Sequence, residues 1–114
     1  MNNKMIVALD SVADFQGDMI TNYLRQQGWN IWHWLSDVWL LADVPPQISP
    51  RDLWERLESI AGPQPIKGFV MTTGQDPKFW GSNNSDSWKW MGRLWGTPDF
   101  STEDSSKVSY QNQV

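Results

Sequence analysis

The chain has no cysteine and only one histidine, His33, among its 114 residues. The absence of cysteine excludes thiol catalysis, thiolate metal sites and disulfides. Because there is only one histidine, metal sites and phosphoesterase sites that need two histidines are excluded. No apolar run approaches the ~20 residues that span a bilayer, and the short N-terminal run is interrupted by Asp10, which argues against a signal peptide. We therefore expect a soluble, cytoplasmic protein with no membrane partner.

Basic residues are also few. Nine Lys and Arg stand against 13 Asp and Glu, which gives a formal net charge of -4. Phosphate contacts dominate nucleic-acid affinity, so an acidic chain has no general attraction to DNA or RNA. We do not expect a nucleic-acid partner.

Tryptophan, in contrast, is abundant, with nine residues in the chain. A Trp side chain can bury about 200 Å² and carries an N–H that needs an acceptor. Clustered Trp residues therefore indicate either an aromatic core or a surface that receives a ligand or partner. The two clusters are Trp32, Trp34 and Trp39 in the middle of the chain, and Trp80, Trp88, Trp90 and Trp95 near its end.

The hydrophobic pattern predicts six elements in the first 73 residues. Asp14 is placed to cap the first helix and Gly28 to end it, and Ser49 followed by Pro50 predicts the start of the second. The order strand, helix, strand, strand, helix, strand is typical of the ferredoxin-like fold, an α+β architecture in which two helices cover one face of an antiparallel four-stranded sheet. The predicted elements are strands 5–9, 30–35, 38–43 and 66–73 and helices 14–27 and 50–61.

The two middle strands form a hairpin around Ser36-Asp37. With a two-residue turn, Trp34 lies opposite Trp39 and Trp32 opposite Leu41, which predicts a tryptophan face. The other face, expected to meet the helices, carries Ile31, His33, Leu35, Val38, Leu40 and Ala42.

The aromatic segment 76–98 follows as a C-terminal extension of a single domain, 1–98. It predicts a short helix over 88–95, capped by Asp86 or Ser87, and this segment is a candidate to cover the tryptophan face. Residues 99–114 are polar and lack periodicity, so we expect a disordered tail.

Three interpretations of the tryptophan face compete. In the first interpretation, the C-terminal segment or a second copy of the chain packs on this face, since large exposed apolar patches are rare on monomers. Alternatively, it binds a partner protein, because Trp is enriched at interaction hot spots. A third possibility is base stacking with single-stranded RNA, which the acidic charge disfavours.

Catalytic patterns are sparse. His33 shares the aliphatic face, which favours a hydrogen-bonded structural role over general-base catalysis. Asp10 directly follows the first strand, near Asp14 and Asp18. These acids could hold Mg²⁺ with waters, or Asp10 could pair across a dimer axis, but their positions favour a strand-end and helix-cap role over a metal site.

Several stretches together resemble a known family: MIVALD at 5–10, LRQQGW at 24–29, IWHWLSDVWLLAD at 31–43, SPRDLWERLESI at 49–60 and IKGFVMTT at 66–73. They look like the SinR-like branch of the small ferredoxin-like proteins, which also include the CRISPR-adaptation double-strand-binding subunit and the VapD toxin ribonucleases. The resemblance implies a homodimer and, as in some members, a metal-dependent nuclease site at Asp10.

The sequence therefore favours a small non-enzymatic binding protein without a cofactor. We expect an accessory or inhibitor protein of the phage or mobile-element kind, in an anti-defence role, that docks on a protein partner. One alternative is a metal-dependent nuclease that uses Asp10 and Mg²⁺. Another is a nucleotide-binding protein in which Trp and Arg93 sandwich a base between the sheet and the C-terminal segment. The candidate binding residues are Trp32, Trp34, Trp39, Trp80, Trp88, Trp90, Trp95 and Arg93.

Overall fold

A computed structural model of the chain describes residues 1–81 and 84–99, apart from the side chain of Trp34. The chain divides into two compact units, Met1–Gly74 and Gln75–Val114. It is a mixed α+β protein. Of the predicted tail 99–114, all but Asp99 lies outside the described residues.

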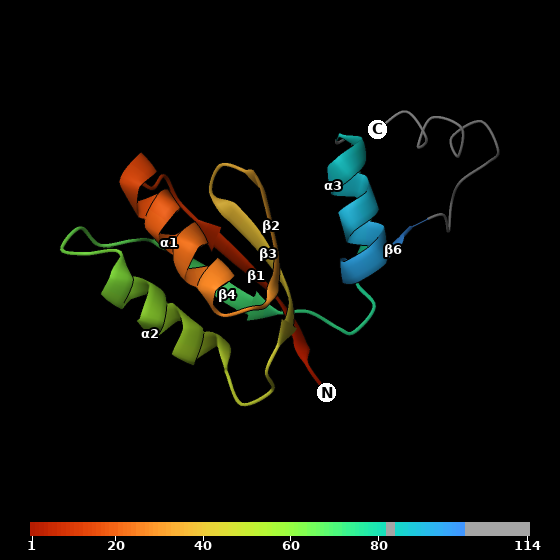
Figure 1. Cartoon of the computed structure of the whole chain (residues 1–114), viewed down its shortest axis with the longest axis horizontal. Coiled ribbons are helices and arrows are strands. Elements are labelled where there is room, and N and C mark those ends of the chain that lie inside the picture. Colours follow the sequence, from red (N-terminus) through yellow and green to blue (C-terminus); the bar gives the residue numbers. More distant parts are fainter. Residues whose placement is uncertain (82–83, 100–114) are drawn as a thin grey trace. The chain divides into compact units, whose positions relative to one another are not determined.

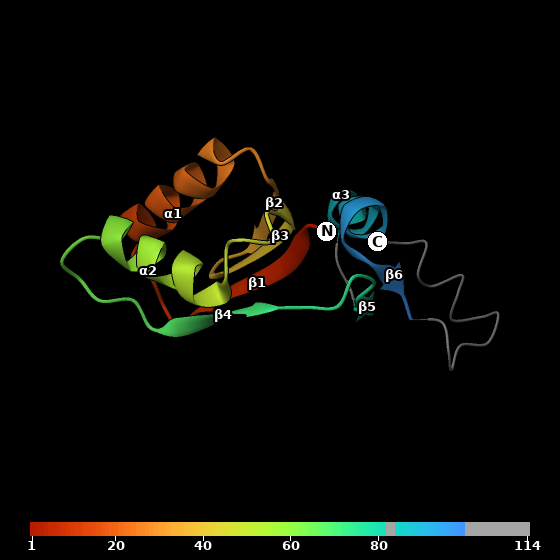
Figure 2. The same ribbon diagram turned by 90° about the horizontal axis from the view of Figure 1, so that it is seen from below.

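The first unit has the predicted order of elements. Its four strands form one antiparallel sheet in the order β2-β3-β1-β4, and both helices lie on one side of this sheet (Figures 1 and 2). We call the opposite side of the sheet its outer face. The elements are β1 (Asn3–Leu9), α1 (Asp14–Gln26), β2 (Asn30–Leu35), β3 (Val38–Val44), α2 (Pro50–Ile60) and β4 (Gly68–Thr72).

The core of this unit lies between the sheet and the two helices. Alternate residues of β1 point toward the helices because side chains of a strand alternate between its two faces. They meet the apolar stripes of α1 and α2, whose spacing places Ile20 with Leu24 and Leu53 with Leu57. The fully buried members are Met5, Val7, Ile20, Leu24, Trp39, Leu41, Val44, Leu53 and Leu57.

Helix α1 does not begin at an Asp14 cap, as the sequence predicts. Its N-cap is Ala13, whose backbone N–H donates to Oε1 of Gln16 at 3.2 Å. The buried amide of Gln16 also donates to the carbonyls of Ala61 and Gln64, at 3.3 and 3.0 Å. One glutamine thus satisfies the start of α1 and ties it to the end of α2. The predicted end is confirmed, since Gly28 has a φ of 82°.

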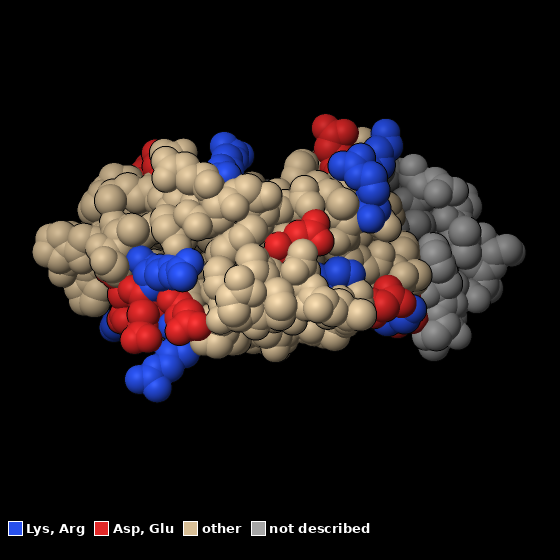
Figure 3. Space-filling view, turned by 60° about the horizontal axis from the view of Figure 1, so that its bottom comes forward, with Lys and Arg blue, Asp and Glu red and all other residues tan. Residues whose placement is uncertain are grey.

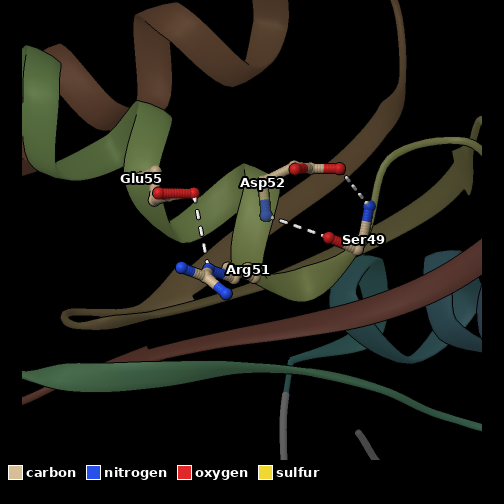
Figure 4. A network of polar contacts seen from close by, with 4 residues as sticks. All are labelled: Ser49, Arg51, Asp52 and Glu55. Atoms are coloured by element: carbon tan, nitrogen blue, oxygen red, sulfur yellow. Dashed lines mark hydrogen bonds and ion pairs between the residues drawn. The ribbon is translucent and has the colours of Figure 1, made fainter.

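The predicted start of α2 is confirmed. Ser49 Oγ accepts from the Asp52 N–H at 3.0 Å, and Asp52 Oδ2 accepts from the Ser49 N–H at 3.1 Å (Figure 4). The two hydrogen bonds form a reciprocal capping box. The backbone N–H and then the hydroxyl of Ser49 lower the pKa of Asp52, because both favour the charged carboxylate. Arg51 and Glu55 add a 3.7 Å ion pair that is too exposed to contribute much.

The predicted tryptophan face is wrong. The two-residue turn is confirmed by the pairing of Leu35 with Val38, but the register shifts between Trp32 and Leu35, so Trp32 pairs with Leu40 instead of Leu41. Such a bulge moves every residue beyond it to the other face. Trp39 therefore faces the helices with 0% of its surface exposed, and Leu40 lies on the outer face.

The second unit holds two short parallel strands, β5 (Lys78–Phe79) and β6 (Thr97–Pro98). Between them lies α3 (Ser85–Trp90), which continues directly as a π-helix over Met91–Trp95. The predicted helix over 88–95 exists but begins three residues earlier. The cap is neither Asp86 nor Ser87 but Asn84, whose side-chain oxygen accepts from the Ser87 N–H at 2.7 Å.

Candidate functional site

Three aromatic rings of the second unit meet edge to face. The Trp88 indole is 5.0 Å from the Phe79 ring at an interplanar angle of 85°, and 6.1 Å from the Trp80 indole at 74°. Edge-to-face contacts place the positive ring edge on the negative face of its neighbour. We call Phe79, Trp80 and Trp88 the aromatic cluster. It joins a residue of β5 and the residue that follows it to a residue of α3.

The aromatic cluster reaches the surface through Trp80, which is 45% exposed, whereas Trp88 is half-buried. Arg93 is also exposed. The other two tryptophans of this unit, Trp90 and Trp95, are buried. Of the four tryptophans predicted here as a binding group, only Trp80 is classed as exposed.

The helix is wider than an α-helix between the buried Trp90 and Trp95. Five residues of an α-helix turn through about 500°, which separates the first from the last by well over a quarter turn. In this segment the Gly96 N–H donates to the Met91 carbonyl at 2.8 Å, which closes a wider five-residue turn. This wider turn lies in the segment that ends at the buried Trp95.

The two hairpin tryptophans whose side chains the structure describes, Trp32 and Trp39, do not form a joint site. Trp39 is in the core, and Trp32 lies in register with Leu40 on the outer face, where it is half-buried. The side chain of Trp34 is outside the described part of the structure. Trp32 and Trp39 therefore lie on opposite faces, and the fully buried Trp39 has no surface to offer to a partner.

His33 is hydrogen-bonded within the fold, as its position in the sequence predicts. Its ring stacks on Trp39 with centroids 4.2 Å apart, and Nε2 is 2.7 Å from the Ser36 carbonyl. A carbonyl only accepts, so Nε2 carries the proton. Nδ1 is 3.3 Å from Thr21 Oγ1, which itself accepts from the Trp39 indole N–H at 2.9 Å. The Thr21 hydroxyl is then free to donate to Nδ1, so all these polar groups are satisfied.

Asp10 is exposed at the end of β1, as predicted, and accepts a 3.5 Å hydrogen bond from Ser11. Asp14 and Asp18 lie nearby on α1. No three His, Cys, Asp or Glu residues of the described chain are grouped closely enough to hold a metal ion. Asp14 and Asp18 instead line an open hollow of about 620 Å³, together with Ser11, Val12, Ala13, Gly17, His33, Ser36 and Asp37.

Sequence reasoning missed two exposed apolar residues of β4. Phe69 is 53% exposed and Met71 is 45% exposed. They pair with Ala8 and Ile6 of β1, respectively, on the outer face. The sequence pattern could have shown this, because Phe69 and Met71 alternate along the predicted strand with Val70, which packs on the core.

Charged side chains of both signs are scattered over the face seen in Figure 3, without a large area of either sign. This face offers no basic track to a phosphate backbone. Within the described residues, no helix is both long enough and apolar enough to cross a membrane.

Comparison of the chain with protein-family models, with curated proteins and with solved structures finds no match in any of the three.

Proposed function

We propose that this chain is a binding protein without catalytic activity, and that its aromatic cluster contacts a protein partner. One observation carries the proposal: Trp80 is 45% exposed although its ring packs edge to face against Trp88. An exposed Trp whose orientation is already set by a neighbouring ring loses little conformational freedom on binding.

The exposed part of Trp80 is large enough to matter. A Trp presents up to about 250 Å², so 45% exposure leaves roughly 110 Å² for a partner to cover. At about 25 cal/mol per Å², this area corresponds to roughly 2.8 kcal/mol of apolar burial, which is in the range of an interface hot spot. Arg93 is exposed in the same unit, and arginine, like tryptophan, is enriched at interface hot spots.

A capture experiment tests this proposal. The purified chain is immobilised and exposed to an extract of the cells that produce it, and Trp80→Ser is compared with wild type. The matched control is Phe15→Ser, which removes a similarly exposed aromatic ring, 51% exposed, from α1 of the other unit. We expect a stoichiometric partner that is lost with Trp80→Ser and kept with Phe15→Ser. A partner kept by both variants, or lost with both, contradicts the proposal.

We also propose that the first unit has the ferredoxin-like fold. The observed element order, the strand order β2-β3-β1-β4 and the two helices on one side support this assignment. A cytoplasmic accessory or inhibitor protein of the phage or mobile-element kind fits an acidic chain of this size.

The nuclease alternative has less support, since no three His, Cys, Asp or Glu residues in the described part of the chain are grouped closely enough to hold a metal ion with Asp10. Mg²⁺-dependent cleavage of RNA or DNA that disappears in a folded Asp10→Ala variant would establish it. Binding of a nucleotide, measured by calorimetry and lost with Arg93→Ala, would establish the other alternative.

A further inference from the structure

The two edge strands of the four-stranded sheet differ in how open they are to further pairing. Edge strands usually carry a bulge, a proline or a charge that prevents another strand from adding to them. At one edge, β2 contains the register shift between Trp32 and Leu35. At the other edge, β4 pairs with β1 over five consecutive residues without a shift. Its sequence, GFVMT, contains neither proline nor charge.

Two hydrogen bonds show which backbone groups of β4 point away from β1. The Asp10 N–H donates to the Lys67 carbonyl at 2.7 Å, and the Thr73 N–H donates to the Lys4 carbonyl at 2.9 Å. A trans peptide directs its C=O and N–H to opposite sides. The Gly68 N–H and the Thr72 C=O, which share those two peptides, therefore point outward. By alternation along the strand, both polar groups of Val70 also point outward.

We propose that a second copy of this chain pairs with this edge, β4 antiparallel to β4, around a two-fold axis at Val70. In this register the outward groups of Val70 bond to those of Val70 in the second copy. The outward groups of Gly68 in one copy bond to those of Thr72 in the other copy. The two-fold axis repeats this pairing at the other end of the strand. The two sheets then join into one continuous sheet. This inference goes beyond the proposed function and does not depend on it.

The side chains beside the axis suit a second copy. Phe69 of one chain lies opposite Met71 of the other, and the axis repeats this contact, so four exposed apolar side chains become two cross-strand pairs. A two-fold interface must be self-complementary in this way. The nearest charge, Lys67, lies opposite Thr73 of the second copy, so like charges do not meet across the axis.

Cysteine crosslinking tests the register, because the chain has no cysteine of its own. In an antiparallel hydrogen-bonded pair the Cα atoms are about 5.5 Å apart, within the range that a disulfide spans. Val70→Cys should therefore form a disulfide-linked dimer under mild oxidation. Thr72→Cys is the matched control, because its two copies lie four residues apart along the ladder, at about 13 Å. We expect crosslinking at least about tenfold slower for Thr72→Cys. Equal rates, or no dimer with Val70→Cys, overturn the proposal.

Light scattering on unmodified protein gives a second test, which does not depend on altering Val70. The chain has a mass of 13.2 kDa, so a dimer has twice that value, 26.4 kDa. The paired area is small, so we expect a weak dimer that forms with rising concentration. Thr72→Pro removes one outward N–H and leaves the ladder to β1 intact. It should stay monomeric, whereas Thr72→Val should dimerise.

A wild-type chain that stays monomeric at millimolar concentration contradicts the proposal. The two proposals can fail separately, since Thr72→Pro retains Trp80. Capture of a partner by monomeric Thr72→Pro supports the aromatic cluster as a binding surface even where the edge pairing is absent.

Discussion

The hydrogen bond between Trp39 and Thr21 provides a direct test of the hairpin register. Trp39 is fully buried, and its indole N–H donates to Thr21 Oγ1 at 2.9 Å. Thr21→Val keeps the shape of the side chain but removes this acceptor. A buried donor left without a partner costs about 1–3 kcal/mol. Nδ1 of His33 also loses its contact with the hydroxyl, at a smaller cost because His33 is only half-buried. We expect Thr21→Val to lower the free energy of unfolding by about 2 kcal/mol.

Urea unfolding followed by circular dichroism measures this loss. With a slope of about 2 kcal/mol per molar urea, the midpoint should fall by about 1 M. Thr21→Ser is the control, because it keeps the hydroxyl and removes one methyl group, worth at most about 0.8 kcal/mol. The predicted order of stability is wild type, Thr21→Ser, Thr21→Val. If Thr21→Val is as stable as wild type, the indole of Trp39 does not face α1 and the register described above is wrong.

Three further predictions concern the ends of α2 and β4. Ser49→Ala removes the cap of α2 and should cost about 0.5–2 kcal/mol in the same urea assay, whereas a loss below 0.3 kcal/mol would argue against the cap. Folding lowers the pKa of Asp52, so its contribution is complete above about pH 4 and is lost as the pH falls through the lower folded value. The stability difference between wild type and Asp52→Ala should accordingly shrink between pH 6 and pH 2.5, and a constant difference would contradict the assignment. Gly68→Ala should destabilise the chain by more than either change, since its φ of 148° alone costs a non-glycine residue about 1–3 kcal/mol and the new Cβ would lie 2.1 Å from the Ala8 carbonyl oxygen. If Gly68→Ala melts at the same temperature as wild type, the expected destabilisation at position 68 is refuted.

The order of helices and strands in the first unit could be predicted because local patterns determine it. The helix spacing of α1 and α2, the Ser49 cap and Gly28 all act within a few residues, and each is where the sequence predicts it. The cap of α1 was predicted wrongly because Gln16 supplies it through its side chain, and glutamine at that position is equally compatible with a helix interior.

The faces of the hairpin could not be predicted in the same way. A bulge between Trp32 and Leu35 leaves the composition of the strand and its turn unchanged, but it reverses which residues meet the helices. Ile31 and His33 still face the helices, as predicted, because they precede or lie within the shift. Trp39 and Leu40 on the partner strand exchange faces. Burial against α1 decides this register, and burial depends on the whole unit.

For the candidate site, the sequence could predict which residues take part but not how exposed each one is. The sequence indicates that Trp80 and Trp88 belong to an aromatic group, but not that one is exposed and the other half-buried. The sequence also does not indicate that Asn84 starts α3 three residues earlier than predicted, or that the helix continues as a π-turn up to the buried Trp95.

Site-specific photocrosslinking tests the central claim most directly. A photoreactive phenylalanine derivative is placed at position 80, or at position 15 as the control, and the living cells that produce the protein are irradiated. The account predicts one major crosslinked protein from position 80 that is absent from position 15. Crosslinks of equal yield and identity at both positions, or none at position 80 with the folded protein present, would contradict a binding role for the aromatic cluster.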